Sequence, residues 1–555
     1  MLATSLCGSF LCYLLLQPFL FNKIKYYLNE IDWADYVVNY YQSIPSIYRK
    51  SFWLTFLFVN IAYLFHTINF MWGAFDWNAI RFEVDTTTSI NQGKFSAFFL
   101  QNLLFNGKIL PVINNLWSFV GLSLAGILLS YYWELPKKVS TYTIVSLFFA
   151  TTPYTLGWLY HTQHTLGNLW LPTIILTALL LSQKAHLSLN KNYLLNLISV
   201  ALIVISLGTY LPCINFIATV ILGKIFLNIC TSSKSTFKEE CQRELQGLAN
   251  ITAAILIYIF IIILLKYNST IPSRINITTP TTLEHFSLMF NSMFTQFSTP
   301  YPFIDTSYKI LTLLMCIISL FTLINKTTTP KATLIALGLI PFILISTKLS
   351  CLFTYAPKSP NQILQDFYGL PLFYTLFVSL LIRFNTPILK RLTYALTILL
   401  IFMSFVRISY ALKVWKFGFD AELKLSERII TRLEKMPEFN IEKQYKLLQI
   451  GRLPMRQRYY VYNSKERNPE LLDLAYYEPN NSSSAFNFFY QTDFLKNNTT
   501  IPVATKSAKI KDFILKKATP WPHKNSILIA DDYIVLIMSE EGLYKAREKI
   551  LNTPK

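Results

Sequence analysis

A short segment that follows an early apolar run gathers the side chains best suited to chemistry. Residues 73–85 read Gly-Ala-Phe-Asp-Trp-Asn-Ala-Ile-Arg-Phe-Glu-Val-Asp, with three carboxylates and an arginine. An acid close to hydrocarbon is costly, so it is a functional candidate by default. Asp76 comes first, and its neighbours Phe75 and Trp77 suit the headgroup level of a bilayer. Such a carboxylate could accept the proton of a sugar hydroxyl that attacks an anomeric carbon, whereas the alternative is a solvated loop acid.

The other acids of this segment, Glu83 and Asp85, are two residues apart. They could position acceptor hydroxyls or bind a divalent cation, although a solvated acidic face is the simpler interpretation. His161 and His164 form a further pair, but two imidazoles are a weak metal signal, and hydrogen bonding to loop backbone suits them better. The seven cysteines show neither a disulfide framework nor zinc spacing. We therefore expect no metal or other cofactor.

Basic side chains near the predicted outer ends of the apolar runs are candidates for binding an anion. A phosphate that departs as a leaving group needs charge stabilisation, which Lys and Arg supply. Lys348 and Arg407 are of particular interest because each lies within an otherwise apolar run. The alternative for every candidate is that it extends toward lipid headgroups. The candidates are Arg81, Lys94, Lys266, Arg274, Lys348 and Arg407.

The composition indicates a polytopic protein of the lipid bilayer. The 555 residues are 53% hydrophobic and only 14% charged, with a mean hydropathy of +0.37, whereas about a quarter of the residues in a soluble domain are charged. The net charge of +20 could suggest nucleic acid, but Lys and Arg lie mostly in short connectors between apolar runs, as the positive-inside rule expects. We therefore expect no nucleic-acid partner.

About twelve largely apolar runs, each of about 18 or more residues, predict an all-α bundle of eleven or twelve transmembrane helices. The first run has no basic residue before it and no cleavage site after it, so it is expected to be a signal anchor or an interfacial helix. The runs lie near residues 3–21, 52–72, 112–133, 139–158, 166–182, 193–211, 213–230, 247–265, 307–325, 332–350, 367–383 and 392–412.

Connector charge predicts the orientation of these helices. Lys and Arg, Lys224 among them, are assigned to alternate connectors, and that set should be cytoplasmic. The segments 73–111, 266–306 and 351–366, together with everything beyond Lys413, should then face outward. We see no internal sequence repeat, so an inverted-repeat transporter gains no support.

Three domains follow from these patterns. Residues 1–51 form the N-terminal anchor and a cytoplasmic linker, residues 52–412 form the transmembrane domain, and residues 413–555 form a small, polar α+β module outside the membrane. The predicted elements of the module are an amphipathic helix over 421–436 and strands over 458–462 and 527–538, the last with a turn at Asp531-Asp532.

The order of several motifs resembles the type II Gtr membrane glucosyltransferases, the bacterial family that adds glucose to surface polysaccharides such as O-antigen. The likeness runs from about Phe52 to the C-terminus. Lys94 stands where the family has Arg, and Leu211 stands where a Gln commonly follows the Tyr. The matching motifs are Asn69-Phe-Met-Trp-Gly-Ala-Phe-Asp76, Gln92-Gly-Lys-Phe95, Ile109-Leu-Pro-Val112, Leu207-Gly-Thr-Tyr-Leu-Pro212 and Trp521-Pro-His-Lys-Asn-Ser-Ile527 with the hydrophobic hairpin after it.

The resemblance implies a GT-C-like architecture in the bacterial cytoplasmic membrane, with the C-terminus outside. It implies a polyprenyl-phosphate-linked hexose as the donor, flipped outward, and a lipid-linked polysaccharide as the acceptor. Asp76 lies where the family keeps its essential acid, with Glu83 and Asp85 beside it. The donor phosphate would be bound by Arg81, Lys94, Arg274, Lys348 and Arg407.

Other classes of function remain open at the level of sequence. A transporter or flippase of lipid-linked sugars would also have many spans, but it should place ionisable groups in mid-span positions, whereas here they are expected at the outer ends and in loops. A polysaccharide polymerase or ligase should carry a large late loop rich in Arg and His rather than an early acidic loop. A purely structural scaffold would leave the outer charges without a role.

Overall fold

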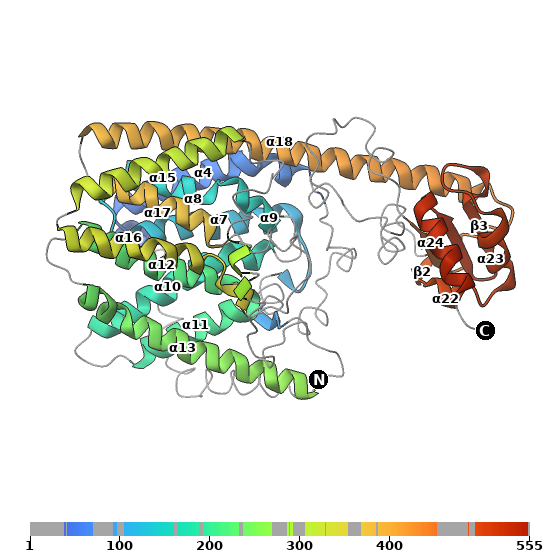
Figure 1. Ribbon diagram of the computed structural model, residues 1–555, viewed down its shortest axis with the longest axis horizontal. Coiled ribbons are helices and arrows are strands. Elements are labelled where there is room, and N and C mark those ends of the chain that lie inside the picture. The colour runs from blue at the N-terminus through green and yellow to red at the C-terminus, as the bar shows by residue number, and fades with distance from the viewer. Residues whose placement is uncertain are drawn as a thin grey trace.

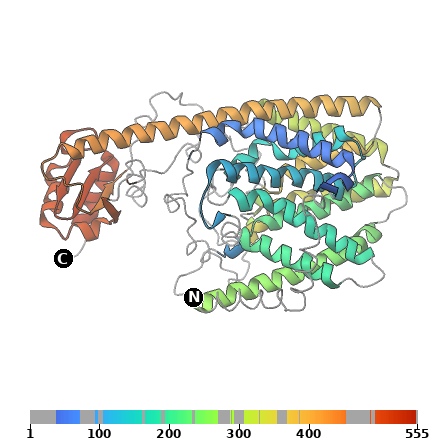
Figure 2. The same cartoon turned by 180° about the vertical axis from the view of Figure 1, so that it is seen from behind.

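The computed structural model divides the chain into a helical bundle and a small C-terminal module, joined by one long helix (Figure 1). The module stands beyond one end of the bundle in both Figure 1 and the reverse view of Figure 2. The structure describes residues 38–39, 41–69, 71, 93–96, 105–159, 165–187, 193–231, 237–268, 286–287, 289–291, 293, 306–327, 329–352, 368–384, 387–451, 487 and 494–552.

Within these residues, eleven apolar helices of ten residues or more form the bundle. Seven of them, α4, α7, α10, α12, α13, α15 and α18, are long and apolar enough to cross a membrane, which makes the chain a multi-pass membrane protein. The bounds are α4 Ser46–Ile68, α7 Pro111–Tyr132, α8 Val139–Ala150, α10 Thr165–Leu187, α11 Tyr193–Thr209, α12 Cys213–Thr231, α13 Phe237–Asn268, α15 Thr306–Lys326, α16 Pro330–Ser346, α17 Leu370–Arg383 and α18 Pro387–Glu434.

Each predicted apolar run after the first coincides with one of these helices, whereas the run at 3–21 lies outside the described residues. The fourth run is shorter than predicted because Pro153 cannot continue a helix. There α8 ends at Ala150 and two short turns follow, a 3₁₀ turn over Pro153–Thr155 and α9 over Leu156–Leu159. Proline also begins helices, as Pro111 does at the start of α7.

Successive helices alternate in direction, so the bundle has two distinct ends. Ser51 donates to the carbonyl of Val139 over 3.2 Å where α4 and α8 begin, and Tyr63 donates to the carbonyl of Ala150 over 3.0 Å toward their other ends. The two helices are therefore parallel, with the oppositely directed α7 between them in the chain. We name the end where α7, α10, α12, α15 and α17 finish the connector end, and the opposite end the loop end.

Close helix contacts depend on small residues. A Cβ on Gly121 of α7 would lie 2.7 Å from the indole of Trp170, and one on Gly126 would lie 2.5 Å from the side chain of Ser146. Hydroxyls within the apolar helices bond to their own backbone, as Ser118 does to the carbonyl of Asn114 at 2.6 Å. Both devices let small and polar residues pack within a bundle of apolar helices.

The last helix, α18, extends well past the loop end of the bundle (Figure 1). The predicted domain boundary at 412/413 lies inside it, and the helix predicted over 421–436 is its final part rather than a separate element. The reason is local, because no proline follows Pro387 before the helix ends at Glu434, and Gly418 alone does not break it.

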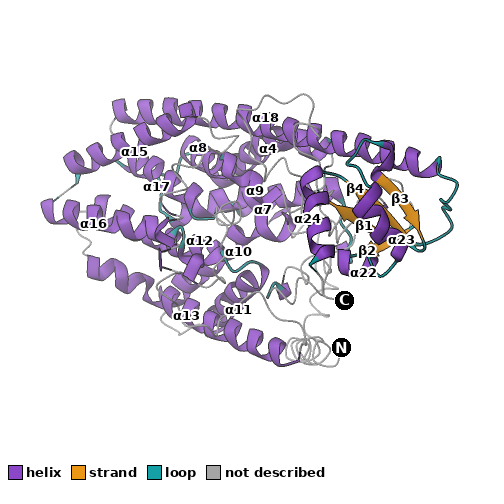
Figure 3. Ribbon diagram, turned by 45° about the vertical axis from the view of Figure 1, so that its right-hand side comes forward, coloured by secondary structure: helices purple, strands orange, loops and turns teal. Residues whose placement is uncertain are grey.

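The described part of the module contains a four-stranded mixed sheet in the order β2-β1-β4-β3 (Figure 3). The predicted hairpin is confirmed: β3 and β4 pair antiparallel around Asp531-Asp532, and Asp531 has a φ of 55°. The strand predicted over 458–462 lies outside the described residues. The bounds are β1 Tyr445–Ile450, β2 Leu495–Asn498, α22 Ile501–Ala504, α23 Ala508–Asp512, a π turn Phe513–Lys517, a 3₁₀ turn Lys524–Ser526, β3 Ile527–Ala530, β4 Tyr533–Ile537 and α24 Glu540–Leu551.

The end of α18 packs on one face of this sheet, and α24 packs on the other. Ile429 and Leu433 border the same small cavity as Leu536 of β4. The guanidinium of Arg432 lies 5.4 Å from the ring centre of Trp521 and donates to the carbonyl of Pro522 over 2.9 Å. The tail motif that begins at Trp521 thus anchors the long helix to the module.

Candidate functional site at the loop end of the bundle

The predicted site residues divide into those that the structure describes and those that it does not. The three acids lie outside the described residues, as do two of the cations and both histidines of the pair at 161 and 164. Lys94, Lys348 and Arg407 are described. The predicted residues outside the description are Asp76, Arg81, Glu83, Asp85, His161, His164 and Arg274.

The described segments on either side of the acidic segment are both anchored at the loop end. Before it, Met71 follows the end of α4 and is fully buried. After it, residues 93–96 pack against α11 and α13, where a Cβ on Gly208 would collide with Phe95 and where Phe95 stacks on Tyr258 with ring centres 6.0 Å apart. The described residues on the two sides of the acidic segment therefore lie at the same end of the bundle.

Lys94 lies above a set of buried aromatic rings, which we name the aromatic floor: Tyr210, Tyr368 and Trp158. Its Nζ lies 5.7 Å from the ring centre of Tyr210. The Tyr210 and Tyr368 ring centres are 5.6 Å apart, and the Tyr368 ring stacks on Trp158 at 4.5 Å. The Tyr368 hydroxyl also donates to the carbonyl of Asn168 over 3.2 Å, which fixes the floor to α10.

Lys348 follows α16 at the same end, and its side chain is only 1% exposed. The short turn after it is held by Asn215 of α12, whose Oδ1 accepts from the Ser350 amide at 2.6 Å and whose Nδ2 donates to the Ser350 hydroxyl at 3.0 Å. A lysine covered in this way faces protein rather than lipid headgroups, so its burial argues against the headgroup alternative.

Lys94 and Lys348 are linked through one turn of the chain. Tyr210, under Lys94, ends the segment that leads into α12, and Asn215 of α12 holds the turn beside Lys348. Arg407 lies elsewhere, on α18, one turn after Ser404, whose hydroxyl faces Tyr308 of α15 at 3.5 Å. Lys94 and Lys348 therefore both lie at the loop end near the start of α12, whereas Arg407 lies near a different helix contact, between α18 and α15.

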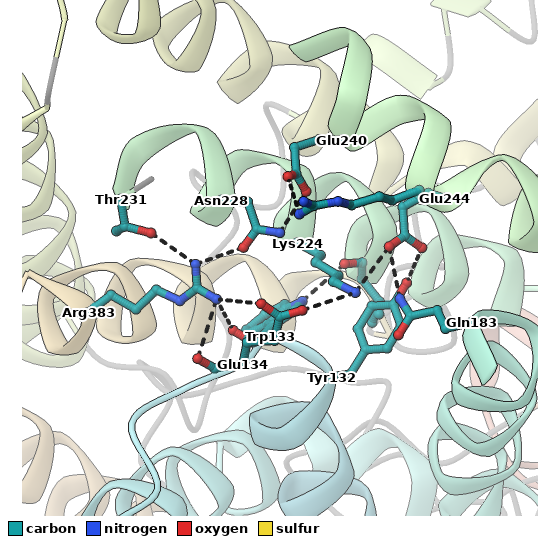
Figure 4. Close-up of polar contacts among 12 residues, drawn as sticks. Tyr132, Trp133, Glu134, Gln183, Lys224, Asn228, Thr231, Glu240, Glu244 and Arg383 are labelled. Carbon is teal, nitrogen blue, oxygen red and sulfur yellow. Dashed lines mark hydrogen bonds and ion pairs between the residues drawn. The ribbon is translucent and has the colours of Figure 1, made fainter. Parts of the chain in front are cut away.

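The sequence analysis missed a second polar group, which we name the connector-end cluster (Figure 4). Lys224 lies within α12, not in a connector as its charge pattern suggested, and its Nζ is 3.1 Å from Glu244 of α13. The side chains are only 6% and 2% exposed. Glu244 also accepts from the Tyr132 hydroxyl at 2.7 Å and from the Gln183 amide at 2.9 Å.

Arg383, the last residue of α17, completes the connector-end cluster. It donates to the carbonyl of Trp133 at 2.6 Å and to Asn228 at 2.8 Å, and Asn228 donates to Glu240 at 2.7 Å. Three acids face three bases, so the cluster is balanced in charge and joins α7, α10, α12, α13 and α17. The charged members are Glu134, Lys224, Glu240, Arg243, Glu244 and Arg383.

This cluster corrects the expectation that ionisable groups gather only at the outer ends and in loops. Its signal in the sequence was weak but present, because Glu240 and Glu244 share one face of α13 at a spacing of four. With every charged side chain satisfied by neighbours, the cluster has the character of a structural link. Among the described residues, no three His, Cys, Asp or Glu side chains come together in a way that could hold a metal ion.

Comparison with known proteins identifies the bundle. Residues 74–383 match the family model described as "Glucosyl transferase GtrII". The match covers more than half of the chain, begins just before Asp76, contains Lys94 and Lys348, and ends at Arg383. It does not reach α18 or the module, to which the motif resemblance extended. No curated protein matches the chain.

Proposed function

We propose, since the chain belongs to the GtrII glucosyl transferase family, that it moves glucose from a polyprenyl-phosphate donor onto a surface glycan such as O-antigen. Glucosyl transfer follows from the family. The lipid-linked donor, the glycan acceptor and the outer face of the bacterial cytoplasmic membrane are our proposal. The observation that carries it is the position of the family segment on a membrane bundle with two basic side chains at one end.

The donor phosphate is assigned to Lys348 and Lys94. Charge stabilisation is what a departing phosphate requires, and Lys348 provides a covered ammonium while Lys94 is set over the aromatic floor. The polyprenyl chain would lie against the apolar surface of the bundle, where many large hydrophobic side chains are exposed. Arg81, Arg274 and Arg407 are further candidates for the same anion.

The acidic segment supplies the other half of the reaction. Asp76 accepts the proton of the acceptor hydroxyl while its oxygen forms a bond to the anomeric carbon, and the bond from that carbon to the phosphate oxygen breaks. The polyprenyl phosphate leaves with the electron pair. Since phosphate is already a competent leaving group, one carboxylate suffices, and Glu83 and Asp85 are assigned to orienting the acceptor.

Helix direction supports an outward site. The basic connectors share one end of the bundle, which the positive-inside rule assigns to the cytoplasm, whereas Lys94 and Lys348, two of the described candidates, lie at the other. The C-terminal module also stands beyond the loop end (Figure 2). At that place it could contact a polymeric acceptor outside the membrane.

Analysis of the surface glycan tests this function. A strain that lacks the chain should lose one hexose per repeat unit in mass spectra, and the wild-type gene should restore it. Membranes that contain the protein should also transfer labelled glucose from synthetic polyprenyl-phosphate-glucose to the purified glycan. An unchanged glycan in the deletion strain, together with no transfer of labelled glucose in membranes, would contradict the proposed function.

Transport of a lipid-linked sugar is the second candidate, because the connector-end cluster does place a buried ion pair between membrane helices. Purified protein in liposomes separates the two. Transfer to acceptor with donor and acceptor on the same side supports the transferase, whereas movement of donor across the bilayer without transfer supports the transporter.

A further inference from the structure

The segment that carries Lys94 is wedged into the bundle. Gly93 has a φ of +75°, a left-handed conformation that glycine adopts without strain. Two residues on, Phe95 stacks on Tyr258 with a ring-centre distance of 6.0 Å, and Ser96 is only 4% exposed. The backbone on both sides of Lys94 is therefore fixed by a turn and by a buried ring.

Gly208 of α11 provides the space for this wedge. A Cβ at this position would lie 2.4 Å from the Phe95 ring and 2.6 Å from the Ser96 hydroxyl, so even alanine would displace the segment. The two motifs in which these residues occur, 92–95 and 207–212, thus form one structural unit. Glycine is required at 208 by this contact, since Phe95 occupies the place of its side chain.

The ring of Tyr210 lies under the Lys94 ammonium. A cation within about 6 Å of a ring centre is attracted by the electrons of the ring face, and the distance here is 5.7 Å. Tyr368 and Trp158 pack in series behind this ring and support its position. This support fixes the side chain of Lys94, whereas the wedge fixes its backbone.

We propose that Tyr210 is a positioning residue: it holds the Lys94 ammonium ready for the donor phosphate, on a segment that the Phe95–Gly208 wedge has already fixed. The proposal rests on the assignment of Lys94 to the donor phosphate. A lysine on a free segment would lose conformational entropy when it met an anion, and prior placement removes much of that cost. The contact with the ring face itself needs no acceptor atom and uses none of the ammonium hydrogens.

Donor kinetics test the pairing. Tyr210→Leu should raise the donor KM by roughly 3- to 30-fold, the range of a cation–π contact, with a smaller change in kcat. Tyr210→Phe keeps the ring face and should restore a KM close to that of wild type. In the double variant with Lys94→Met, the effects should not multiply, because the ring acts through the lysine. A full multiplicative loss in the double variant, or no rescue by Phe, would overturn the proposal.

The chain offers a matched control pair at the connector end. Lys390 lies 5.6 Å from the ring centre of Tyr394, in the first turns of α18. Lys390→Met and Tyr394→Leu change the same residue types and should leave the donor KM unchanged. If they raise it as much as the Tyr210 variants do, the effect is a general loss of fold, and the proposal fails.

A second readout does not depend on activity. Amine-reactive labelling of the full-length protein, read by mass spectrometry, should show Lys94 protected in the wild type and in Tyr210→Phe, and several-fold more reactive in Tyr210→Leu and Gly208→Val. Equal labelling of Lys94 in all variants would overturn the positioning role. If the wild type transfers no sugar from any polyprenyl-phosphate hexose, the proposed function fails, while the labelling still decides the placement of Lys94.

Discussion

Asp76 is the residue to which we assign the central proton transfer of the proposed reaction. It is the acid closest to the end of a span, aromatic residues flank it, and the family segment begins just before it. Asp76→Asn keeps size and much of the hydrogen bonding but removes the proton acceptor. Since positioned acid–base groups contribute about 100- to 10,000-fold to rate, we expect that loss in transfer, measured in membranes with equal amounts of inserted protein.

Asp85→Asn is the matched control for this change, because it removes an equal charge from the same segment. It should retain at least part of the activity. Full glycan modification by Asp76→Asn at normal expression would contradict the assignment and make Glu83 the next candidate.

Lys348 is the second residue to test. Lys348 is only 1% exposed, so its ammonium is covered by protein rather than by solvent. Removing one charge-assisted hydrogen bond costs about 1.5–3 kcal/mol, so Lys348→Met should lower kcat/KM for the donor by roughly 10- to 100-fold. Lys413→Met, an exposed lysine on α18, should not. If Lys348→Met turns over as fast as the wild type at limiting donor, Lys348 does not bind the donor phosphate and its role is structural.

Residue types indicated some of these positions and could not indicate others. Lys348 was predicted because a charge in an apolar run is costly wherever it points. Lys224 also lies in an apolar run, but it was counted as a connector charge. Its pairing with Glu244 depends on the tertiary contact between α12 and α13, which the sequence does not show. Tyr210 lay in the motif over 207–212, but its packing with Tyr368 and Trp158 could not be predicted, because these ring contacts are tertiary.

At the scale of the element, the connector-end cluster is the feature with the clearest energetic consequence. Glu244→Gln leaves Lys224 buried with Glu134 as its remaining acid, 3.6 Å away and largely exposed. Breaking a buried ion pair by removing one partner costs about 3–5 kcal/mol. We expect a clear loss of thermal stability in detergent, measured by the unfolding midpoint.

Two variants control this prediction. The double change Lys224→Met with Glu244→Gln should recover part of the loss, because no charge is left unpaired. Glu541→Gln removes an acid from an exposed ion pair with Lys545 on α24 and should have no measurable effect. If Glu244→Gln unfolds at the wild-type temperature, the cluster does not stabilise the bundle.

The helices themselves were largely predictable, because long apolar runs have few alternatives to a helix. Their ends were less so. Pro153 shortens α8, and the absence of proline lengthens α18 far beyond its apolar part. Hydropathy measures which residues favour lipid, whereas helix ends depend on backbone chemistry, so the two need not coincide.

At the scale of the whole molecule, orientation is the first question. The alternating helices and the basic connectors predict that the module lies outside the cytoplasmic membrane. Alkaline phosphatase fused after Lys555 should therefore be active, and a fluorescent cytoplasmic reporter at the same site should be dark. An inactive phosphatase fusion together with a fluorescent cytoplasmic reporter would show the opposite orientation and would contradict the prediction that Asp76 faces outward.

The continuity of α18 sets both the reach and the rotation of the module. Beyond residue 413 the helix continues to Glu434, which is about 30 Å at 1.5 Å per residue. Each residue also turns the module by about 100°, so a deletion of seven residues shortens the spacer by about 10 Å but nearly restores its rotational phase, whereas a deletion of five leaves it about 140° out of phase.

Deletions within 417–424 separate these two effects, since Trp415 packs on His66 of the bundle and Leu425 belongs to the core that continues into the module. If the module presents the acceptor to the site, the seven-residue deletion should retain more transfer than the five-residue one. If both deletion variants transfer glucose at the wild-type rate, transfer does not depend on the rotational orientation of the module. If the module does bind the acceptor, α18 would set both its distance from the membrane and its rotational angle, and this would select where along the polymer the glucose is added.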